Sequence, residues 1–218
     1  MPTGTCPSAG ARCARTLNIR TFDVMFVSVP EDERLERILS AAYVCFTRHG
    51  VRRTTMDDIA QEASMSRPAV YQFVRNKDDA FRRLVVRLLE GSLAAARTAT
   101  AASGSLEERL SGALEAKLDL TLRLWDEAPA HAAELLAPTR LTAELLEGYN
   151  TAMLDLLTVT VSEANLRVDA PEFVELLLAL TRGLEADLSD PDAPRRRLRH
   201  GVAMLVAALE PLDYKEPV

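Results

Sequence analysis

The sequence predicts an all-α protein of about nine helices. Apolar residues recur every three or four positions along most of the chain from Glu31 onward, which is the period of a helix with one buried face. Alanine and leucine are abundant while aromatic residues make up 5%, a composition that favours helix over sheet. No stretch alternates between apolar and polar residues as a half-buried strand does. A chain of 218 residues with 48% hydrophobic content is long enough to bury a core.

Residues 1–30 are expected to form a disordered leader ahead of the folded part. The apolar stretch at 22–29 contains Asp23 and lacks a small-residue cleavage site, which argues against a signal peptide. Met25 is a second possible start codon beside Met1, and the sequence leaves both open.

The helices are placed by their apolar stripes and by the residues that begin or end them. The first is expected over 31–49, because Gly50 suits the position that follows a helix end. Proline and glycine breaks divide the chain after residue 76. The later helices are expected over 77–101, 106–127, 130–137, 139–166, 171–188 and 194–210.

Residues 54–77 contain two short apolar patterns joined by a tight polar turn. Thr55 and Asp58 form a capping-box pattern at the start of the first. Ser66 is a favoured N-cap for the second, and Pro68 is tolerated there because the N–H that it lacks is unpaired in a first turn. A helix, a three-residue turn and a second short helix are typical of a helix-turn-helix, whose second helix enters the DNA major groove.

The second short helix, expected over 66–74, carries side chains that suit DNA. Arg67 can pair with guanine and Gln72 with adenine, while Ala69 permits close approach to a thymine methyl. Tyr71 offers a hydroxyl to phosphate. The alternative is an ordinary helical hairpin with a solvated polar face.

Charge is distributed unevenly along the chain. Residues 1–100 carry 15 Lys and Arg against 11 Asp and Glu, a net of +4. Residues 101–218 carry 11 against 21, a net of −10. Thr55 and Lys77 add a hydroxyl and a positive charge near helix starts, where anions bind readily. The basic part is therefore expected to bind a polyanion, with chance scatter as the alternative.

Residues 34–81 resemble the N-terminal domain of the TetR family of bacterial transcriptional regulators. The motifs that carry the resemblance are RILSAA, F and HG in the first helix, then TTMDDIA, AVYQF and NKDDAF, all in order. The resemblance implies a helix-turn-helix DNA-binding domain over 31–76 and a helical effector-binding and dimerisation domain over 77–218. It implies double-stranded operator DNA, an unknown small-molecule effector and a second copy of the chain as partners, and no cofactor. The expected function is a transcriptional repressor that a small molecule releases from its operator.

Carried over position by position, the resemblance implies particular DNA contacts. Thr55 matches the phosphate-contacting cap of the second helix, and Tyr71 matches a phosphate-contacting tyrosine. Lys77 matches the lysine that opens the fourth helix and touches the backbone. The leading edge of the recognition helix matches Ser66, Arg67, Pro68 and Ala69.

The sequence departs from the family pattern in and after the turn. The family commonly has Ala-Gly-Val-Ser where residues 63–66 are Ala-Ser-Met-Ser, so Ser64 must adopt a backbone shape that glycine accepts at lower cost. Phe73 stands where a polar His or Tyr is frequent, which implies one phosphate contact fewer. Val74 stands where Phe is common, which implies a lighter local core.

The second half offers weaker expectations. Large side chains with polar groups on the middle helices are candidate ligand contacts, with a plain core as the alternative: Trp125, His131, Leu136, Tyr149 and Met153. Two apolar stripes near the C-terminus are candidates for a dimer interface, with a monomer core as the alternative. They comprise Phe173, Leu177, Leu180 and Leu184, then Leu198, Val202, Leu205, Val206 and Leu209. The basic run 195–199 is expected to form a salt-bridged face.

Other function classes find little support. The sequence has no Gly-rich phosphate loop, no HExxH and no G-x-S-x-G, so no enzyme is expected. Cys6, Cys13 and Cys45 form neither a metal site nor a disulfide framework, which favours a reduced cytoplasmic protein. No apolar run is long enough to cross a membrane. A helical carrier or enzyme that keeps the DNA-binding fold, and an architectural DNA-binding protein without effector, remain the alternatives.

Overall fold

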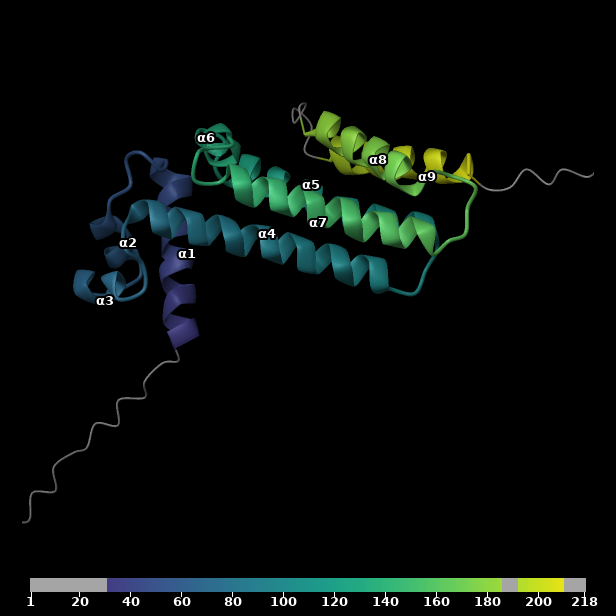
Figure 1. Ribbon diagram of the computed structural model, residues 1–218. Helices are drawn as coiled ribbons and strands as arrows, with labels where there is room; N and C mark the ends of the chain where they lie inside the picture. Colours follow the sequence, from purple (N-terminus) through teal and green to yellow (C-terminus); the bar gives the residue numbers. More distant parts are fainter. Residues whose placement is uncertain (1–30, 186–191, 210–218) are drawn as a thin grey trace, which may run out of the picture.

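The computed structural model describes residues 31–185 and 192–209, which form nine α-helices and no strand (Figure 1). The expected leader, with Cys6, Cys13 and Met25, lies outside the described residues. The helices are α1 (Glu31–His49), α2 (Met56–Glu62), α3 (Arg67–Tyr71), α4 (Lys77–Ala101), α5 (Leu106–Glu127), α6 (Ala132–Leu136), α7 (Ala143–Ser162), α8 (Ala170–Leu184) and α9 (Ala193–Ala207). The all-α fold class is confirmed for the described residues.

The predicted bounds of α1, α4 and α5 are confirmed, whereas the other helices with predicted bounds end earlier than predicted, and some also begin later. The helix expected over 139–166 begins later, because Thr139 and Thr142 form a turn in which the Thr139 N–H donates to the Thr142 hydroxyl at 3.0 Å. It ends before Asn165, whose φ of +53° does not continue a helix. The helix expected over 66–74 ends at Tyr71, after which the chain tightens. The N–H groups of Phe73 and Val74 both donate to the carbonyl of Val70.

The first core joins α1, α2 and α3 to the beginning of α4. Phe46 of α1 and Phe81 of α4 meet edge to face, with ring centroids 5.5 Å apart and an interplanar angle of 87°. Ile59 of α2 and Val70 of α3 are fully buried against them, so each short helix is anchored by its apolar face. Neither helix has the length of about 12 residues at which an isolated helix becomes marginally stable in water.

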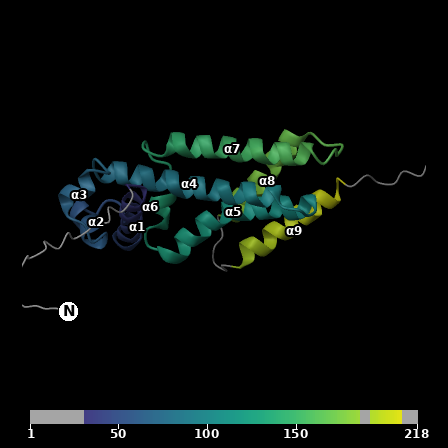
Figure 2. The same cartoon turned by 90° about the horizontal axis from the view of Figure 1, so that it is seen from below.

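The second core lies between α4, α5, α7, α8 and α9. Figure 2 shows α4 and α5 running through this part, with α7 to one side and α9 to the other. A small polar network is buried within it: the Ser92 hydroxyl lies 2.9 Å from the carbonyl of Ala116 and 2.8 Å from the Tyr149 hydroxyl. Each hydroxyl therefore has a partner, as burial requires.

The long helix α4 contributes to both cores. Its residues Ala80, Phe81 and Leu84 pack in the first, and Leu89 and Ala96 pack in the second. The two parts of the molecule are thus connected by a continuous helix, along which Figure 1 shows α2 and α3 at one end and α8 and α9 toward the other.

Side-chain contacts also cross the junction between the two parts. The Tyr43 hydroxyl of α1 donates to Glu127 at the end of α5, at 2.5 Å. Arg87 of α4 pairs with Glu36 of α1 at 3.0 Å. Leu135 of α6 packs against the first core.

The apolar stripes proposed for a dimer interface face the core of the single chain. Leu177 and Val202 are 0% exposed, and Phe173 is 7% exposed. Leu198 is also 0% exposed. The remaining members are half-buried against the same core: Leu180, Leu184, Leu205, Val206 and Leu209. Phe173, Leu177 and Val202 therefore belong to the core of the single chain, and an interface role for the half-buried members stays a prediction. In the basic run, Arg195 and Arg199 pair with Asp119 and Glu115 of α5.

Gly50 is the residue on which the end of α1 depends. Its φ is +78°, and a Cβ there would lie 2.9 Å from Oε2 of Glu134 and 3.0 Å from Nδ1 of His131. We expect Gly50→Ala to lower the free energy of unfolding by about 1–2 kcal/mol, mainly through the positive φ. Urea denaturation measures this loss.

Gly91→Ala is the matched control, because Gly91 lies within α4 and nothing would meet its Cβ within 4 Å. This substitution should stabilise by about 0.5–1 kcal/mol. Equal effects at both positions would contradict the role given to Gly50.

Candidate nucleic-acid interface

The first helix of the helix-turn-helix begins with the predicted capping box. The Thr55 hydroxyl accepts from the N–H of Asp58 at 3.2 Å, and Oδ2 of Asp58 accepts from the N–H of Thr55 at 2.8 Å. The hydrogen bond from the Thr55 backbone is the main cause that lowers the pKa of Asp58. The cap fixes the start of α2 and leaves Thr55 exposed at the surface.

The turn that follows is a Schellman motif. The N–H of Met65 donates to the carbonyl of Ala60 at 2.9 Å, and the N–H of Ser64 donates to Gln61 at 3.0 Å. Ser64 takes the left-handed position with φ +53°, as the comparison with Ala-Gly-Val-Ser predicts. This position is what turns the chain from α2 into α3 within three residues.

Helix α3 is fixed in direction by one polar and one apolar anchor. The Ser66 hydroxyl accepts from the N–H of Ala69 at 3.4 Å, and Pro68 occupies the first turn as predicted. Val70, which is 0% exposed, holds the opposite face in the first core. Arg67, Tyr71 and Gln72 consequently point away from the core and are exposed.

Arg67 is held at the surface by two neighbours. Its guanidinium pairs with Asp57 of α2 at 3.1 Å and lies 5.6 Å from the centroid of the Tyr71 ring. The Tyr71 hydroxyl is 3.4 Å from Nη2 of Arg67. All three groups are exposed, so the pair is worth little in water and can exchange for another partner. Asp57 was not singled out from the sequence, because residues ten apart across a turn give no periodic signal.

The start of α4 adds a cation beside the turn. Asn76 caps the helix through Oδ1, which accepts from the N–H of Asp79 at 2.8 Å. Nζ of Lys77 donates to the carbonyl of Arg52 at 3.0 Å, which ties α4 to the segment between α1 and α2. An ammonium group has three donors, so this contact leaves others for a phosphate.

The structure brings the predicted DNA contacts to one end of the molecule, where Figure 1 shows α2 and α3. Six are exposed and two are half-buried, namely Ala69 and Lys77. Their contact with DNA stays a prediction. The exposed ones are Thr55, Ser66, Arg67, Pro68, Tyr71 and Gln72.

The five predicted ligand contacts are not gathered in one place. Tyr149 and Met153 are packed in the second core. Trp125 is half-buried on α5. His131 lies beside Gly50 at the junction. These four line none of the cavities, whereas Leu136 lines the small cavity described below. A ligand role for all five stays a prediction.

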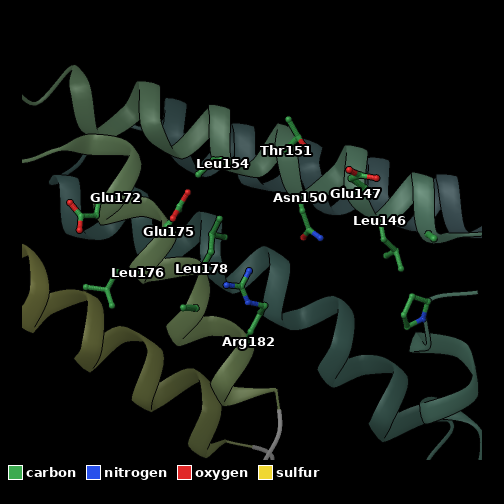
Figure 3. Close-up of a pocket in the computed structure, with 13 residues that line it drawn as sticks. Leu146, Glu147, Asn150, Thr151, Leu154, Glu172, Glu175, Leu176, Leu178 and Arg182 are labelled. Atoms are coloured by element: carbon green, nitrogen blue, oxygen red, sulfur yellow. The ribbon is translucent and has the colours of Figure 1, made fainter.

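Two cavities of the second part differ in character. A groove of about 780 Å³ lies between α7 and α8, and Figure 3 shows Asn150 and Arg182 directed into it from opposite sides. A smaller cavity of about 50 Å³, the α6 cavity, is almost wholly apolar. It is lined by Val85, Leu88, Leu89, Leu120, Leu124, Leu135, Leu136, Thr142 and Leu146.

The residues at 31–185 and 192–209 contain no cluster of His, Cys, Asp or Glu that could hold a metal ion. None of the helices in this part of the chain is long and apolar enough to span a bilayer.

Comparison with known proteins identifies the first part of the chain. Residues 38–84 match the family described as bacterial regulatory proteins, tetR family. These limits coincide with Ile38 and Leu84, the first and last residues buried in the first core. The matched unit is therefore the packed helix-turn-helix together with the beginning of α4.

Relatives extend the comparison in two ways. The transcriptional activator FasR of Mycolicibacterium smegmatis is 31% identical over 91 residues, which cover 42% of this chain and 42% of FasR. A putative transcriptional regulator from Pseudomonas aeruginosa shares the fold, with a TM-score of 0.67 at 20% identity over 85% of this chain and 94% of that one. The SmeT–triclosan complex has a TM-score of 0.58 at 22% identity over 81% of this chain and 91% of that one. The chain thus spans less than half the length of FasR in sequence, whereas the fold likeness covers most of it.

The turn at Ser64 carries a conformational cost that glycine would remove. Ser64 is exposed, and in the described structure its side chain makes no hydrogen bond, so only the positive φ distinguishes it. We expect Ser64→Gly to raise the free energy of unfolding by about 1 kcal/mol. The shift of the urea midpoint measures the gain.

Ser64→Ala serves as the control, since it removes the hydroxyl and retains the left-handed cost. Its stability should stay near that of the unchanged protein. A glycine variant no more stable than the alanine variant would show that the turn is not strained.

Proposed function

Through residues 38–84 the chain belongs to the tetR family of bacterial regulatory proteins, and on that premise we propose that it is a sequence-specific DNA-binding transcriptional regulator. The observation that carries the proposal is the exposed face of α3, held outward by Val70 and capped at Ser66. A short helix presented in this way can enter the major groove, with α2 bracing it across the backbone.

In this proposal the side chains divide into two roles. Arg67 and Gln72 read base edges, because a guanidinium suits guanine and an amide suits adenine. Thr55, Tyr71 and Lys77 hold phosphates and set the register of the helix. Arg67 would exchange Asp57 for a base on binding, which costs little at an exposed ion pair.

We further propose that a small molecule controls DNA binding through the α6 cavity. Leu135 both lines this cavity and packs against the first core. A ligand that widens the cavity would therefore displace α6 and, with it, a contact of the DNA-binding part. The SmeT–triclosan complex is a small-molecule complex of a protein with this fold, which supports a ligand here. The protein would exist in two conformations, one with α6 in place and one with α6 displaced, and the ligand would raise the population of the second.

The proposed direction of regulation is repression, relieved by the ligand. FasR is named an activator, so the direction is decided by expression of the adjacent gene. Deleting the coding sequence should raise that expression, and a fall would reverse the assignment. The proposed location is the cytoplasm, where the operator DNA is found.

The proposed assembly is a homodimer formed by the outer faces of α8 and α9. Leu176 of α8 and Met204 of α9 are 51% and 61% exposed, so both side chains are accessible to a partner. These two residues join the half-buried members of the stripes as interface candidates. A two-fold dimer would place two recognition helices for two half-sites about one helical turn apart.

Arg67→Ala should weaken binding to the operator by about 1–3 kcal/mol and relax its base preference, because a base contact is lost. Lys77→Ala should weaken binding to all sequences alike, because a phosphate contact carries no sequence information. Electrophoretic shift of the upstream DNA fragment against unrelated DNA, at one stated salt concentration, measures both.

Asp57→Asn is the companion variant, since it removes the ion-pair partner of Arg67 and a negative charge from the proposed DNA-facing surface. It should tighten binding to operator and unrelated DNA together. Absence of any selective shift by the unchanged protein would refute the proposed function. Equal losses of selectivity in Arg67→Ala and Lys77→Ala would refute the division of roles.

Met204→Asp should convert the dimer to a monomer while leaving the fold intact, because an exposed side chain can be charged without disturbing the core. Sedimentation measures the mass of each variant. Val159→Asp is the control: Val159 is 57% exposed on α7, outside the proposed interface, and its variant should remain dimeric. Loss of the dimer in both would place the interface elsewhere.

A further inference from the structure

A second cavity lies at the junction between the two parts of the molecule. This junction cavity, of about 220 Å³, is formed by α1, α4 and α5. It shares Leu88, Leu120 and Leu124 with the α6 cavity, so the two spaces adjoin along these leucines. Its lining consists of Ser40, Tyr43, Leu84, Arg87, Leu88, Leu120, Arg123, Leu124 and Glu127.

The polar groups of the junction cavity stand against an apolar wall of four leucines. Arg87 is already engaged, with Glu36 at 3.0 Å and the Ser40 hydroxyl at 3.3 Å. Arg123 donates from Nε to the carbonyl of Asp119 at 3.3 Å, and it forms no ion pair among the described residues. Its guanidinium is thus the cation of this cavity with charge to offer.

The Tyr43 hydroxyl is suited to a carboxylate. It donates to the carboxylate of Glu127 at 2.5 Å. Burial and the hydrogen bond to Glu127 raise the pKa of Tyr43, so the hydroxyl remains a donor throughout the physiological pH range. Arg123 is close enough to oppose this rise electrostatically. A tyrosine donor and an arginine together are complementary to one further carboxylate.

We propose that the junction cavity binds a small aliphatic carboxylate. The carboxylate would contact Arg123 and take the Tyr43 hydroxyl from Glu127, and the chain would lie along Leu84, Leu88, Leu120 and Leu124 toward the α6 cavity. The two spaces together amount to about nine water-sized groups, at ~30 Å³ for each. An eight-carbon chain with its charged end at the rim fits this space.

The regulatory consequence rests on the proposed function. The hydrogen bond from Tyr43 to Glu127 joins α1, which carries the DNA-binding part, to the end of α5. A ligand carboxylate that replaces Glu127 releases this link while it fills the space between the helices. Binding of the anion is thereby coupled to the orientation of α1.

Calorimetric titration of the full chain with octanoate tests the site, with 1-octanol as the uncharged probe of equal chain length. Octanoate should bind saturably and at least about tenfold more tightly than 1-octanol, as expected for a charge-assisted hydrogen bond. Trp125, the sole tryptophan, follows Leu124 and gives a fluorescence readout of the same titration.

Arg123→Gln should weaken octanoate binding by about tenfold or more and leave 1-octanol unaffected. Arg97→Gln is the matched control, because Arg97 is exposed near the far end of α4 and does not line the cavity. Tyr43→Phe keeps the ring and removes the donor, so it should weaken octanoate binding and abolish any effect of octanoate on operator affinity.

The outcomes separate this inference from the proposed function. A protein that shifts the operator selectively but binds no octanoate overturns the inference alone. Equal affinity for octanoate and 1-octanol, or equal effects of Arg123→Gln and Arg97→Gln, also overturns it. A protein that binds octanoate through Arg123 but shows no selective operator shift retains the site and loses the regulatory function.

Discussion

The packing of Phe81 on Phe46 is the contact on which the DNA-facing end of the molecule depends. It fixes the beginning of α4 against α1 and closes the core into which Ile59 and Val70 are inserted. Helices of seven and five residues do not persist alone, since few hydrogen bonds offset the entropy of forming them. The exposed face of α3 exists because its buried face has this core to pack against.

Helix α4 connects the two parts of the molecule directly. Since α4 continues from the first core into the second, a shift in one part reaches the other without a flexible linker. The additional contacts at the junction are of a different kind: the hydrogen bond from Tyr43 to Glu127 and the pair between Arg87 and Glu36 are polar and partly solvated. Polar contacts of this type exchange partners at low cost, whereas packed apolar contacts resist rearrangement. The two parts are therefore joined by one continuous helix, α4, and by polar side-chain contacts that can exchange partners.

The surface proposed for DNA is stabilised by local interactions that do not depend on DNA. Thr55, Ser66 and Asn76 satisfy the first N–H groups of three successive helices. The tight turn requires Ser64 to adopt a left-handed backbone conformation, which costs free energy. The two hydrogen bonds of the Schellman motif offset part of this cost. Arg67 rests on Asp57 and Tyr71, so the side chain proposed to read a base is held in place without a DNA partner. Less conformational entropy is then lost on binding.

Much of this protein follows from its sequence alone. The bounds of α1, α4 and α5, the caps at Thr55 and Ser66, and the left-handed Ser64 are local features, set by residues within about four positions of one another. The order of motifs also led to the family of residues 38–84.

The tertiary structure decided what the periodicity left open. An apolar stripe shows that a helix has a buried face, but not whether its own chain or a partner covers it, and Leu177 and Val202 proved to face their own core. The pairing of Arg67 with Asp57, the shared leucines of the two cavities and the link from Tyr43 to Glu127 join residues 10 to 84 positions apart. Such contacts arise only when several helices are packed together, and no local spacing in the sequence encodes them.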